Sequence, residues 1–301
     1  MNLCGARTLG LVAALVTVTI WATFMLVTRF AVKGRFTVEE LLILRLVPGA
    51  LIMAPLMWRL GVIPPQQSWP RATMLMVGAS AVFPFVISTG LAYAPASDGG
   101  ALAPGMLPFW TALMAYLIAG KTTGPRRSIG LAMILLGAMM VSLWQIFAGT
   151  DVSAWKGHLL FLIGSACYAA YTVIFRQSGL SSLHALVIGL FWGTLLMVPF
   201  LIATGNVSFA TVSRLDIVFM IFLQSFIIGI LAMFLFGYAV QVLGAAETAA
   251  FGALTPILTL LGGVAILDET VTTLKIIGII LVAAGVFFAS GVLKKGPKRP
   301  H

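Results

Sequence analysis

Two stretches of the chain, far apart in sequence, carry aromatic rings and an arginine at the same spacing. One is WATFMLVTR, residues 21–29, and the other is YAAYTVIFR, residues 168–176. An offset of 147 residues pairs Trp21 with Tyr168, Phe24 with Tyr171 and Arg29 with Arg176. Aromatic faces hold apolar or planar groups, and arginine binds carboxylates. The set indicates either the wall of a binding site for a small molecule or a packing stripe between helices.

A second set of residues interrupts two other apolar stretches. Pro108 and Pro256 are related by an offset of 148, and each frees the carbonyl four residues earlier, at Pro104 and Gly252. Pro104 likewise frees the carbonyl of Gly100. An unpaired carbonyl in hydrocarbon costs several kcal/mol, so it must face protein, water or a ligand. These positions are either kinks satisfied by neighbouring helices or polar points in the wall of a cavity.

Three arginines fall within or at the ends of apolar stretches. Arg29 and Arg176 stand near the C-terminal ends of expected helices, where the helix dipole favours a cation and a long side chain reaches water. This account is preferred to a substrate contact for both. Arg45 lies further inside its stretch, where a charge is costly and usually paired. We expect it to form a structural ion pair with Glu39, Glu40 or Asp98.

The acidic residues are few, eight in all, and two of them begin expected helices. Asp98 and Glu247 fit helix caps, with a proton-coupling role as the alternative. The sequence contains no carboxylate pair inside a span and no histidine-rich cluster, which argues against a membrane-embedded protease or metalloenzyme. We therefore expect no catalytic residue, no metal and no cofactor, and we favour facilitated diffusion over proton coupling.

The elements that position these residues are membrane helices. Of the 301 residues, 60% are hydrophobic and 9% charged, and the mean hydropathy is +1.09. Such a composition predicts an all-α integral membrane protein, since a run of about 20 apolar residues crosses a bilayer as a helix. The runs predict ten transmembrane helices, at residues 9–32, 38–60, 72–94, 97–119, 127–147, 155–178, 183–204, 215–242, 245–267 and 272–293.

Charge in the loops sets the expected orientation. With the N-terminus inside, the cytoplasmic segments hold eleven Lys and Arg and the external segments, Lys275 among them, hold six. The excess places both termini in the cytoplasm and the chain in the inner (plasma) membrane. The net charge of +10 suits an anionic inner leaflet, so the lipid bilayer rather than nucleic acid is the expected partner.

The chain repeats itself. The segment ALAPGMLPFWTALMAYLIAGKTT, from residue 101, resembles AFGALTPILTLLGGVAILDETV, from residue 249. We expect one five-helix repeat at residues 1–150, a second at 151–293, and a basic cytoplasmic tail at 294–301. An odd number of spans in each half means that the second half is inverted in the membrane.

Glycines at a spacing of seven mark one face of two expected helices. Gly130 and Gly137 in the fifth span correspond to Gly278 and Gly285 in the tenth. They predict close approach of these two helices, and residues 189 and 193 offer a further small-residue contact. A monomer and a homodimer through such a surface both remain open.

The segments LPFWTALMAYLIAGKTTGPRRSIGLAMILLGAMMV and LTPILTLLGGVAILDETVTTLKIIGIILVAAGV carry a family resemblance. Each has a proline in mid-helix and spaced glycines in the next helix, and the second closes its first helix with Glu269, where the first has Lys121. The pattern resembles the drug/metabolite transporter superfamily, in the ten-helix type built from two EamA-like domains. The resemblance covers essentially the whole chain and implies export of small metabolites, often amino acids.

These observations together predict a secondary transporter that works by alternating access and exports small metabolites, with aromatic or branched apolar amino acids as the first choice. The expected substrate-binding residues are Trp21, Phe24, Tyr168, Tyr171, Gly100, Pro104, Pro108, Gly252 and Pro256. The alternative is an exporter of drugs or purine-like compounds, and a membrane enzyme or a channel is a more distant one.

Overall fold

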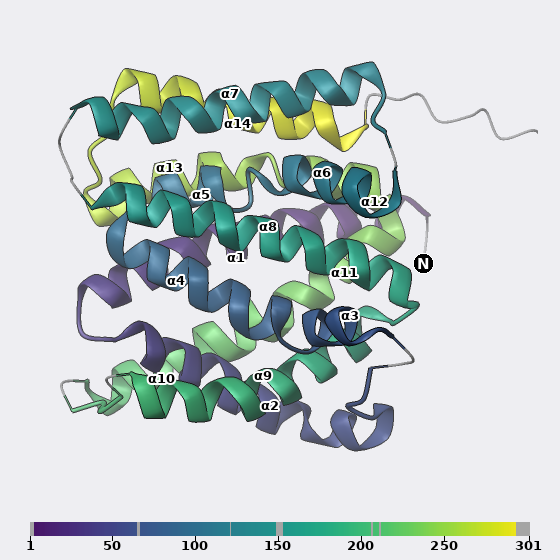
Figure 1. The fold of residues 1–301 in the computed structure, drawn as a ribbon, viewed down its shortest axis with the longest axis vertical. Helices are drawn as coiled ribbons and strands as arrows, with labels where there is room; N and C mark the ends of the chain where they lie inside the picture. The colour runs from purple at the N-terminus through teal and green to yellow at the C-terminus, as the bar shows by residue number, and fades with distance from the viewer. Residues whose placement is uncertain are drawn as a thin grey trace, which may run out of the picture.

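The computed structural model describes residues 3–64, 67–120, 122–148, 153–205, 207–210 and 212–292, and these residues form helices joined by short connections (Figure 1). The elements are α1 (Leu3–Lys33), α2 (Val38–Leu60), α3 (Trp69–Thr73), η1 (Met74–Val82), α4 (Phe83–Tyr93), α5 (Ala96–Leu102), α6 (Leu107–Ala119), α7 (Pro125–Ala148), α8 (Ala154–Ser178), α9 (Ser182–Thr204), α10 (Arg214–Ile221), η2 (Phe222–Leu231), α11 (Ala232–Leu243), α12 (Ala245–Phe251), α13 (Leu254–Leu267) and α14 (Thr273–Ser290).

The expected all-α membrane fold is confirmed. Within the described ranges, nine helical runs are long and apolar enough to cross a membrane. The helix α7 is 24 residues long and is not among the nine. It carries Arg126 and Arg127 in its first turn. The count of ten transmembrane helices therefore stays a prediction.

Side-chain caps fix where several helices begin. Thr37 and Glu40 form a capping box at the start of α2, because each side chain bonds the backbone N–H of the other. Ser181, Ser213 and Thr272 cap α9, α10 and α14 in the simpler way, by accepting from a backbone N–H in the first turn. The start of α2 at residue 38 agrees with the expected span.

The third helical run of each half contains a π-helix. The offset of 148 carries residues 74–82 of η1 onto residues 222–230 of η2. π-helical turns are rare and occur frequently at functional sites, because the wider turn redirects side chains. Because η1 and η2 occupy corresponding positions in the two halves, both are candidates for a place near the functional site.

The expected spans at 97–119 and 245–267 are both broken rather than kinked. The helix α5 ends at Leu102 and α6 begins at Leu107, and α12 ends at Phe251 before α13 begins at Leu254. The residues after each break include Pro108 and Pro256, which fall in the first turn of the new helix. Proline is tolerated there because the first-turn N–H groups have no intrahelical acceptor.

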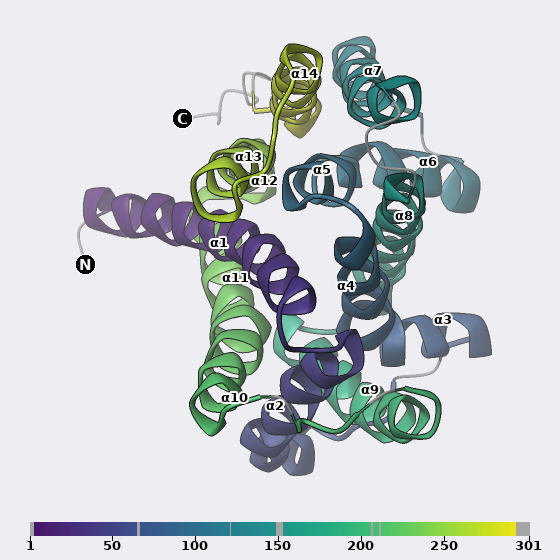
Figure 2. The same ribbon diagram turned by 90° about the vertical axis from the view of Figure 1, so that its left-hand side faces the viewer.

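The packing follows a regular scheme. The helix α1 packs against α11 and α13, and its counterpart α8 packs against α4 and α6. In Figure 2 the two groups lie on opposite sides of the molecule, with α2 and α9 in contact at one edge. The pair α7 and α14 forms a separate layer over the broken helices (Figure 1).

Glycines permit the close approach of α7 and α14, as the sequence predicts. A Cβ added to Gly137 would lie 2.5 Å from the carbonyl oxygen of Gly278, and one added to Gly130 would lie 2.6 Å from the backbone nitrogen of Ala289. Backbone therefore meets backbone along this pair of helices, which leaves no room for side chains at these positions. Gly193 makes the second expected contact, against Ala81 of η1.

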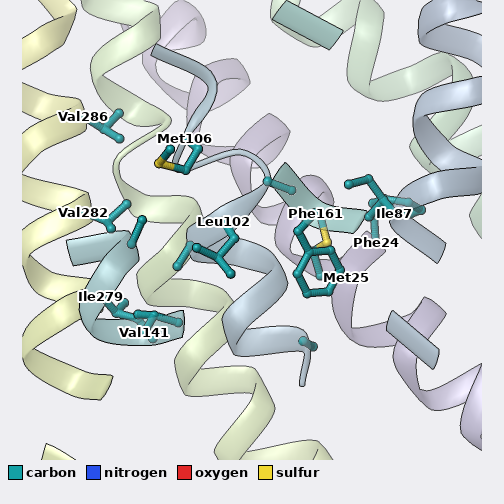
Figure 3. Close-up of a cluster of buried hydrophobic side chains, with 14 of the residues drawn as sticks. Phe24, Met25, Ile87, Leu102, Met106, Val141, Phe161, Ile279, Val282 and Val286 are labelled. Carbon is teal, nitrogen blue, oxygen red and sulfur yellow. The ribbon is translucent and has the colours of Figure 1, made fainter. Parts of the chain in front are cut away.

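The largest cluster of buried apolar side chains surrounds α5 and α8. Phe161 of α8 is completely buried and lies among Phe24, Met25 and Ile87 (Figure 3). Every residue of α5 is buried as well. Since α5 is only seven residues long, its position depends on these neighbours rather than on its own helical hydrogen bonds.

Candidate functional site

Between its two ends, the helix bundle contains a polar network around Arg45 of α2. Its Nη1 lies 3.5 Å from Oε1 of Gln224 in η2, and its Cζ lies 5.1 Å from the ring centre of Phe24 in α1. Gln224 in turn donates from Nε2 to the hydroxyl of Thr28 at 3.1 Å. Gln224 and Thr28 are buried, at 2% and 0% exposure, whereas Arg45 is partly exposed. Side chains of α1 and η2 therefore surround the guanidinium group that α2 carries.

The π-helix η2 holds this network in place. The hydroxyl of Ser225 donates to the backbone carbonyls of Leu44 and Arg45, both at 2.8 Å. These bonds fix η2 against the turn of α2 that carries Arg45. A residue whose backbone and neighbours are fixed in this way holds its side chain in a defined direction, as a binding site requires.

Aromatic rings from α8 complete the surroundings of Arg45. The Tyr168 hydroxyl is close enough to interact electrostatically with the guanidinium. The Tyr168 ring packs against Phe83 at 4.7 Å and against Tyr171 at 5.8 Å between ring centres. We call Phe24, Thr28, Arg45, Tyr168 and Gln224 the Arg45 cluster. It combines one cation with flat apolar surfaces and neutral hydrogen-bonding groups.

The expected aromatic residues are thus divided between two places. Phe24 and Tyr168 belong to the Arg45 cluster, and Tyr171 lies next to it, stacked on Phe175 at 5.9 Å. Trp21 instead packs against Phe236 of α11 at 5.3 Å. Their role in substrate binding stays a prediction, and the ring that Trp21 contacts lies outside the group formed by Phe24 and Tyr168.

The prediction that Arg45 forms an ion pair is wrong. Over the part of the chain that the structure describes, no carboxylate lies within 4.0 Å of its guanidinium. Glu40 caps its own helix and accepts from the N–H groups of Ser208 and Phe209, and Asp98 binds Lys275 and His158. The reason is geometric, since Glu40 faces the connection before α10. Arg45 therefore keeps a positive charge among neutral neighbours, and such a charge attracts an anion.

The carbonyls at the helix breaks are not unpaired, so that expectation is also wrong. The carbonyl of Gly100 accepts from Gly105 N at 3.2 Å, that of Pro104 from Leu107 N at 3.3 Å, and that of Gly252 from Thr255 N at 3.2 Å. Because the chain leaves the helix at each break, a wider turn at Gly100 and tighter turns at Pro104 and Gly252 replace the lost helical bonds. The assignment of these residues to the substrate site stays a prediction.

Two other arginines lie at helix ends. Arg29 donates to the carbonyl of Leu91 at 2.5 Å and so joins the end of α1 to the end of α4. It also lines an open hollow of about 480 Å³ together with Lys33, Asp268 and Glu269. Arg176 is exposed in the last turn of α8, as expected for a side chain that reaches water.

The two acids that begin helices differ in their surroundings. Asp98 is fully buried, and its Oδ1 lies 2.7 Å from Nζ of Lys275 while its Oδ2 lies 2.9 Å from Nε2 of His158. Glu247 forms a 2.7 Å salt bridge with Arg7 at the surface. Asp98 is therefore more than a helix cap. Lys275 was expected in an external loop. It is instead buried in the first turn of α14, where its ammonium group pairs with the buried Asp98 carboxylate.

Comparison with known proteins places the chain in a family. The model of the EamA-like transporter family matches it twice, over residues 8–143 and 155–291. The chain belongs to the EamA-like transporter family. It is therefore a multi-pass membrane transporter, and the resemblance seen in the sequence is confirmed.

Relatives of this EamA-like transporter agree with the assignment. An uncharacterized transporter of Bacillus subtilis (strain 168), YyaM, is 25% identical over 255 residues, which cover 82% of each chain. A solved crystal structure matches at a TM-score of 0.60 with 16% identity, covering 96% of this chain and 98% of the other. At that identity the second match shows the fold alone.

The contacts of several polar residues of this EamA-like transporter were not predicted from the sequence. Thr28 and Gln224 support Arg45, while His158 and Lys275 surround Asp98. Gln224 carries a signal, because it is a polar residue inside the apolar run IFLQSFIIG. His158 and Lys275 lie near the starts of their helices and resemble ordinary residues of a membrane interface. Among the described residues, no group of three or more His, Cys, Asp or Glu is arranged to hold a metal ion.

Proposed function

We propose that this EamA-like transporter is a secondary transporter that exports amino acids with aromatic or branched apolar side chains. The single observation that carries the proposal is the Arg45 cluster, in which a cation with only neutral neighbours stands over one aromatic ring and near another. A substrate carboxylate suits the guanidinium, and an apolar side chain suits the rings of Phe24 and Tyr168.

The substrate ammonium needs acceptors of its own. The hydroxyl of Thr28 and the amide oxygen of Gln224 lie beside Arg45. The carbonyls of Pro104 and Gly252 each keep a second lone pair besides the one used in the turn, so they remain candidates. Recognition of both ends of a zwitterion would explain why cation and neutral acceptors occur together.

Alternating access is supported by the correspondence of the two halves. The family model matches each half separately, and η1 corresponds to η2 at the offset of 148. The contacts of α1 with α11 and α13 recur as those of α8 with α4 and α6. We therefore propose that residues 1–150 and 151–293 form inverted repeats, which exchange their conformations as the substrate site opens to one side and then the other.

We also propose the inner (plasma) membrane as the location, with both termini in the cytoplasm, following the distribution of Lys and Arg. Facilitated diffusion, driven by the substrate gradient, needs no buried proton acceptor at the Arg45 cluster. Uptake into proteoliposomes without substrate inside should then be insensitive to an imposed pH gradient.

The test is counterflow in proteoliposomes, with a panel of amino acids and purines as the unlabelled substrate inside. Accumulation of a labelled aromatic or branched amino acid against its gradient is the expected result, and it requires a carrier. A channel would equilibrate the label without overshoot, and an enzyme would convert it. Exchange of purines but not of amino acids would overturn the proposed substrate.

Arg45→Gln gives the residue-level test, with Arg59→Gln as the matched control because Arg59 is exposed on the same helix. A hydrogen bond to a charged group contributes about 1.5–3 kcal/mol, so apparent affinity should fall by roughly 10- to 150-fold in Arg45→Gln only. Gln224→Glu should have a similar effect, because it would place a carboxylate 3.5 Å from the guanidinium. Unchanged affinity in both variants would remove Arg45 from the site.

A further inference from the structure

A charged cluster separate from the Arg45 cluster surrounds the first turn of α5. Asp98 of α5 binds Lys275 of α14 and His158 of α8, and the three side chains are only 0%, 4% and 4% exposed. An isolated charge in such a place is costly, so each partner depends on the others. The cluster joins one short helix of the first half to two long helices of the second.

Glu269, which follows α13, strengthens the same junction. Its carboxylate accepts from the backbone N–H groups of Ala96 and Ser97, at 2.5 and 3.1 Å, and from the Ser97 hydroxyl. First-turn N–H groups of a helix lack intrahelical acceptors, and the helix dipole favours an anion there. The second half thus supplies three charged or titratable groups to a helix of seven residues.

The broken helices also pack closely at this end of the bundle. A Cβ added to Gly100 of α5 would lie 2.7 Å from the Cβ of Thr259 in α13, so the two helices cross almost in backbone contact. At the other end, the equivalent pair under the 148-residue offset is α6 and α12. These two make no comparable contact and lie on different sides of the molecule in Figure 2.

The ion pair at the other end is exposed and contributes little to stability. The residue one position from the repeat equivalent of Asp98 is Glu247, whose partner Arg7 is 63% exposed while Glu247 itself is 26% exposed. A salt bridge in water contributes little, because solvent screens it and both side chains lose freedom. One end of the bundle is therefore held by buried charges and a tight helix crossing, whereas the Arg7–Glu247 pair at the other end is exposed.

We propose that Asp98, His158, Lys275 and Glu269 form a latch, here called the α5 latch, that keeps this end closed at rest. Opening the end would separate Asp98 from two buried partners, whereas the Arg7 end opens without such a cost. In the proposed orientation the α5 latch is external, so the resting transporter faces the cytoplasm and is ready to load substrate for export. The direction of loading rests on the proposed function, but the closure of one end does not.

The test measures distances between spin labels in a protein lacking Cys4 and Cys167. Cysteines at the exposed positions Tyr93 and Thr270 report on the latch end, and cysteines at the exposed positions Tyr116 and Gln241 report on the Arg7 end. The unaltered latch should give a short, single distance at the first pair. Asp98→Asn should increase the population with a long distance there by about tenfold or more, and shorten the distance at the second pair.

Two further variants separate a latch from a general loss of structure. Glu269→Gln removes the cap without leaving a buried cation unpaired, so it should fold normally and shift the distances in the same direction. Glu247→Gln is the matched control and should leave the first pair unchanged. Distances that stay as in the parent protein in both Asp98→Asn and Glu269→Gln would overturn the latch.

The outcome is independent of the substrate. If the distances shift as expected while no amino acid gives counterflow, the latch stands and the proposed substrate fails. If counterflow with amino acids succeeds while the distances do not respond, the proposed function stands and the latch fails.

Discussion

Replacing Tyr168 tests whether the aromatic residues next to Arg45 serve the substrate or only the fold. The ring of Tyr168 packs on Phe83 at 4.7 Å and on Tyr171 at 5.8 Å, so Tyr168→Ala removes two ring pairs. Such pairs contribute about 0.5–1.5 kcal/mol each beyond buried area, which predicts a loss of about 1–3 kcal/mol from the two ring pairs, in addition to the loss of buried area. Trp21→Ala removes one pair, with Phe236, and should cost about half as much.

A substrate contact adds a second effect that packing does not produce. Loss of one aromatic contact with the substrate, again about 0.5–1.5 kcal/mol, should weaken apparent affinity by about two- to twelve-fold per folded molecule. We expect this loss in Tyr168→Ala, and a smaller one in Tyr168→Phe, which keeps the rings and removes only the hydroxyl near Arg45. Trp21→Ala should also weaken apparent affinity, because the repeat pairs Trp21 with Tyr168.

Two assays on each variant distinguish the explanations. Thermal unfolding in detergent measures the packing loss, and counterflow with the amount of folded protein held equal measures affinity. Lower melting temperature with normal affinity in Tyr168→Ala and Trp21→Ala would remove both residues from the site. Trp21 alone at normal affinity would confine the site to the Arg45 cluster.

The remaining predictions concern packing and topology. Gly137→Leu should lower the yield and melting temperature markedly, because its Cβ would meet the Gly278 carbonyl oxygen. Gly237→Leu on α11 is the control and should be tolerated, because a Cβ added at Gly237 meets no atom within 4 Å. Equal stability of the two variants would contradict the close packing of α7 and α14. Cysteines at residues 2 and 300, in a background lacking Cys4 and Cys167, should resist an impermeant thiol reagent in intact cells, while one at exposed Thr270 should react; labelling of the terminal pair would reverse the proposed orientation.

Several helices begin and end where the sequence predicts, because the features that set these boundaries are local. The run of apolar residues from 38 and the capping box formed by Thr37 and Glu40 together define α2, and both are features of neighbouring residues. The stripes of glycine at a spacing of seven likewise identify the contacting faces of α7 and α14, because a helix fixes which residues share a face.

Some of the site was accessible from the sequence and some was not. Phe24 and Tyr168 were found from the repeated aromatic pattern, and both lie in the Arg45 cluster. The partners of Arg45 were assigned incorrectly, because the nearest acids along the chain point toward other elements. Gln224 is far from Arg45 in sequence, and only the packing of η2 against α2 brings them together.

The sequence by itself determined the membrane class, the family and most helix boundaries of this protein, because hydrophobicity, spacing and capping act over a few turns of one helix. The tertiary structure alone decided which charges are paired and which are not. Asp98, His158 and Lys275 come from three separate helices, and their spacing along the chain does not predict that their side chains are in contact. A charge inside a membrane protein takes whichever partner the neighbouring helices present, so its role follows from packing rather than from sequence position.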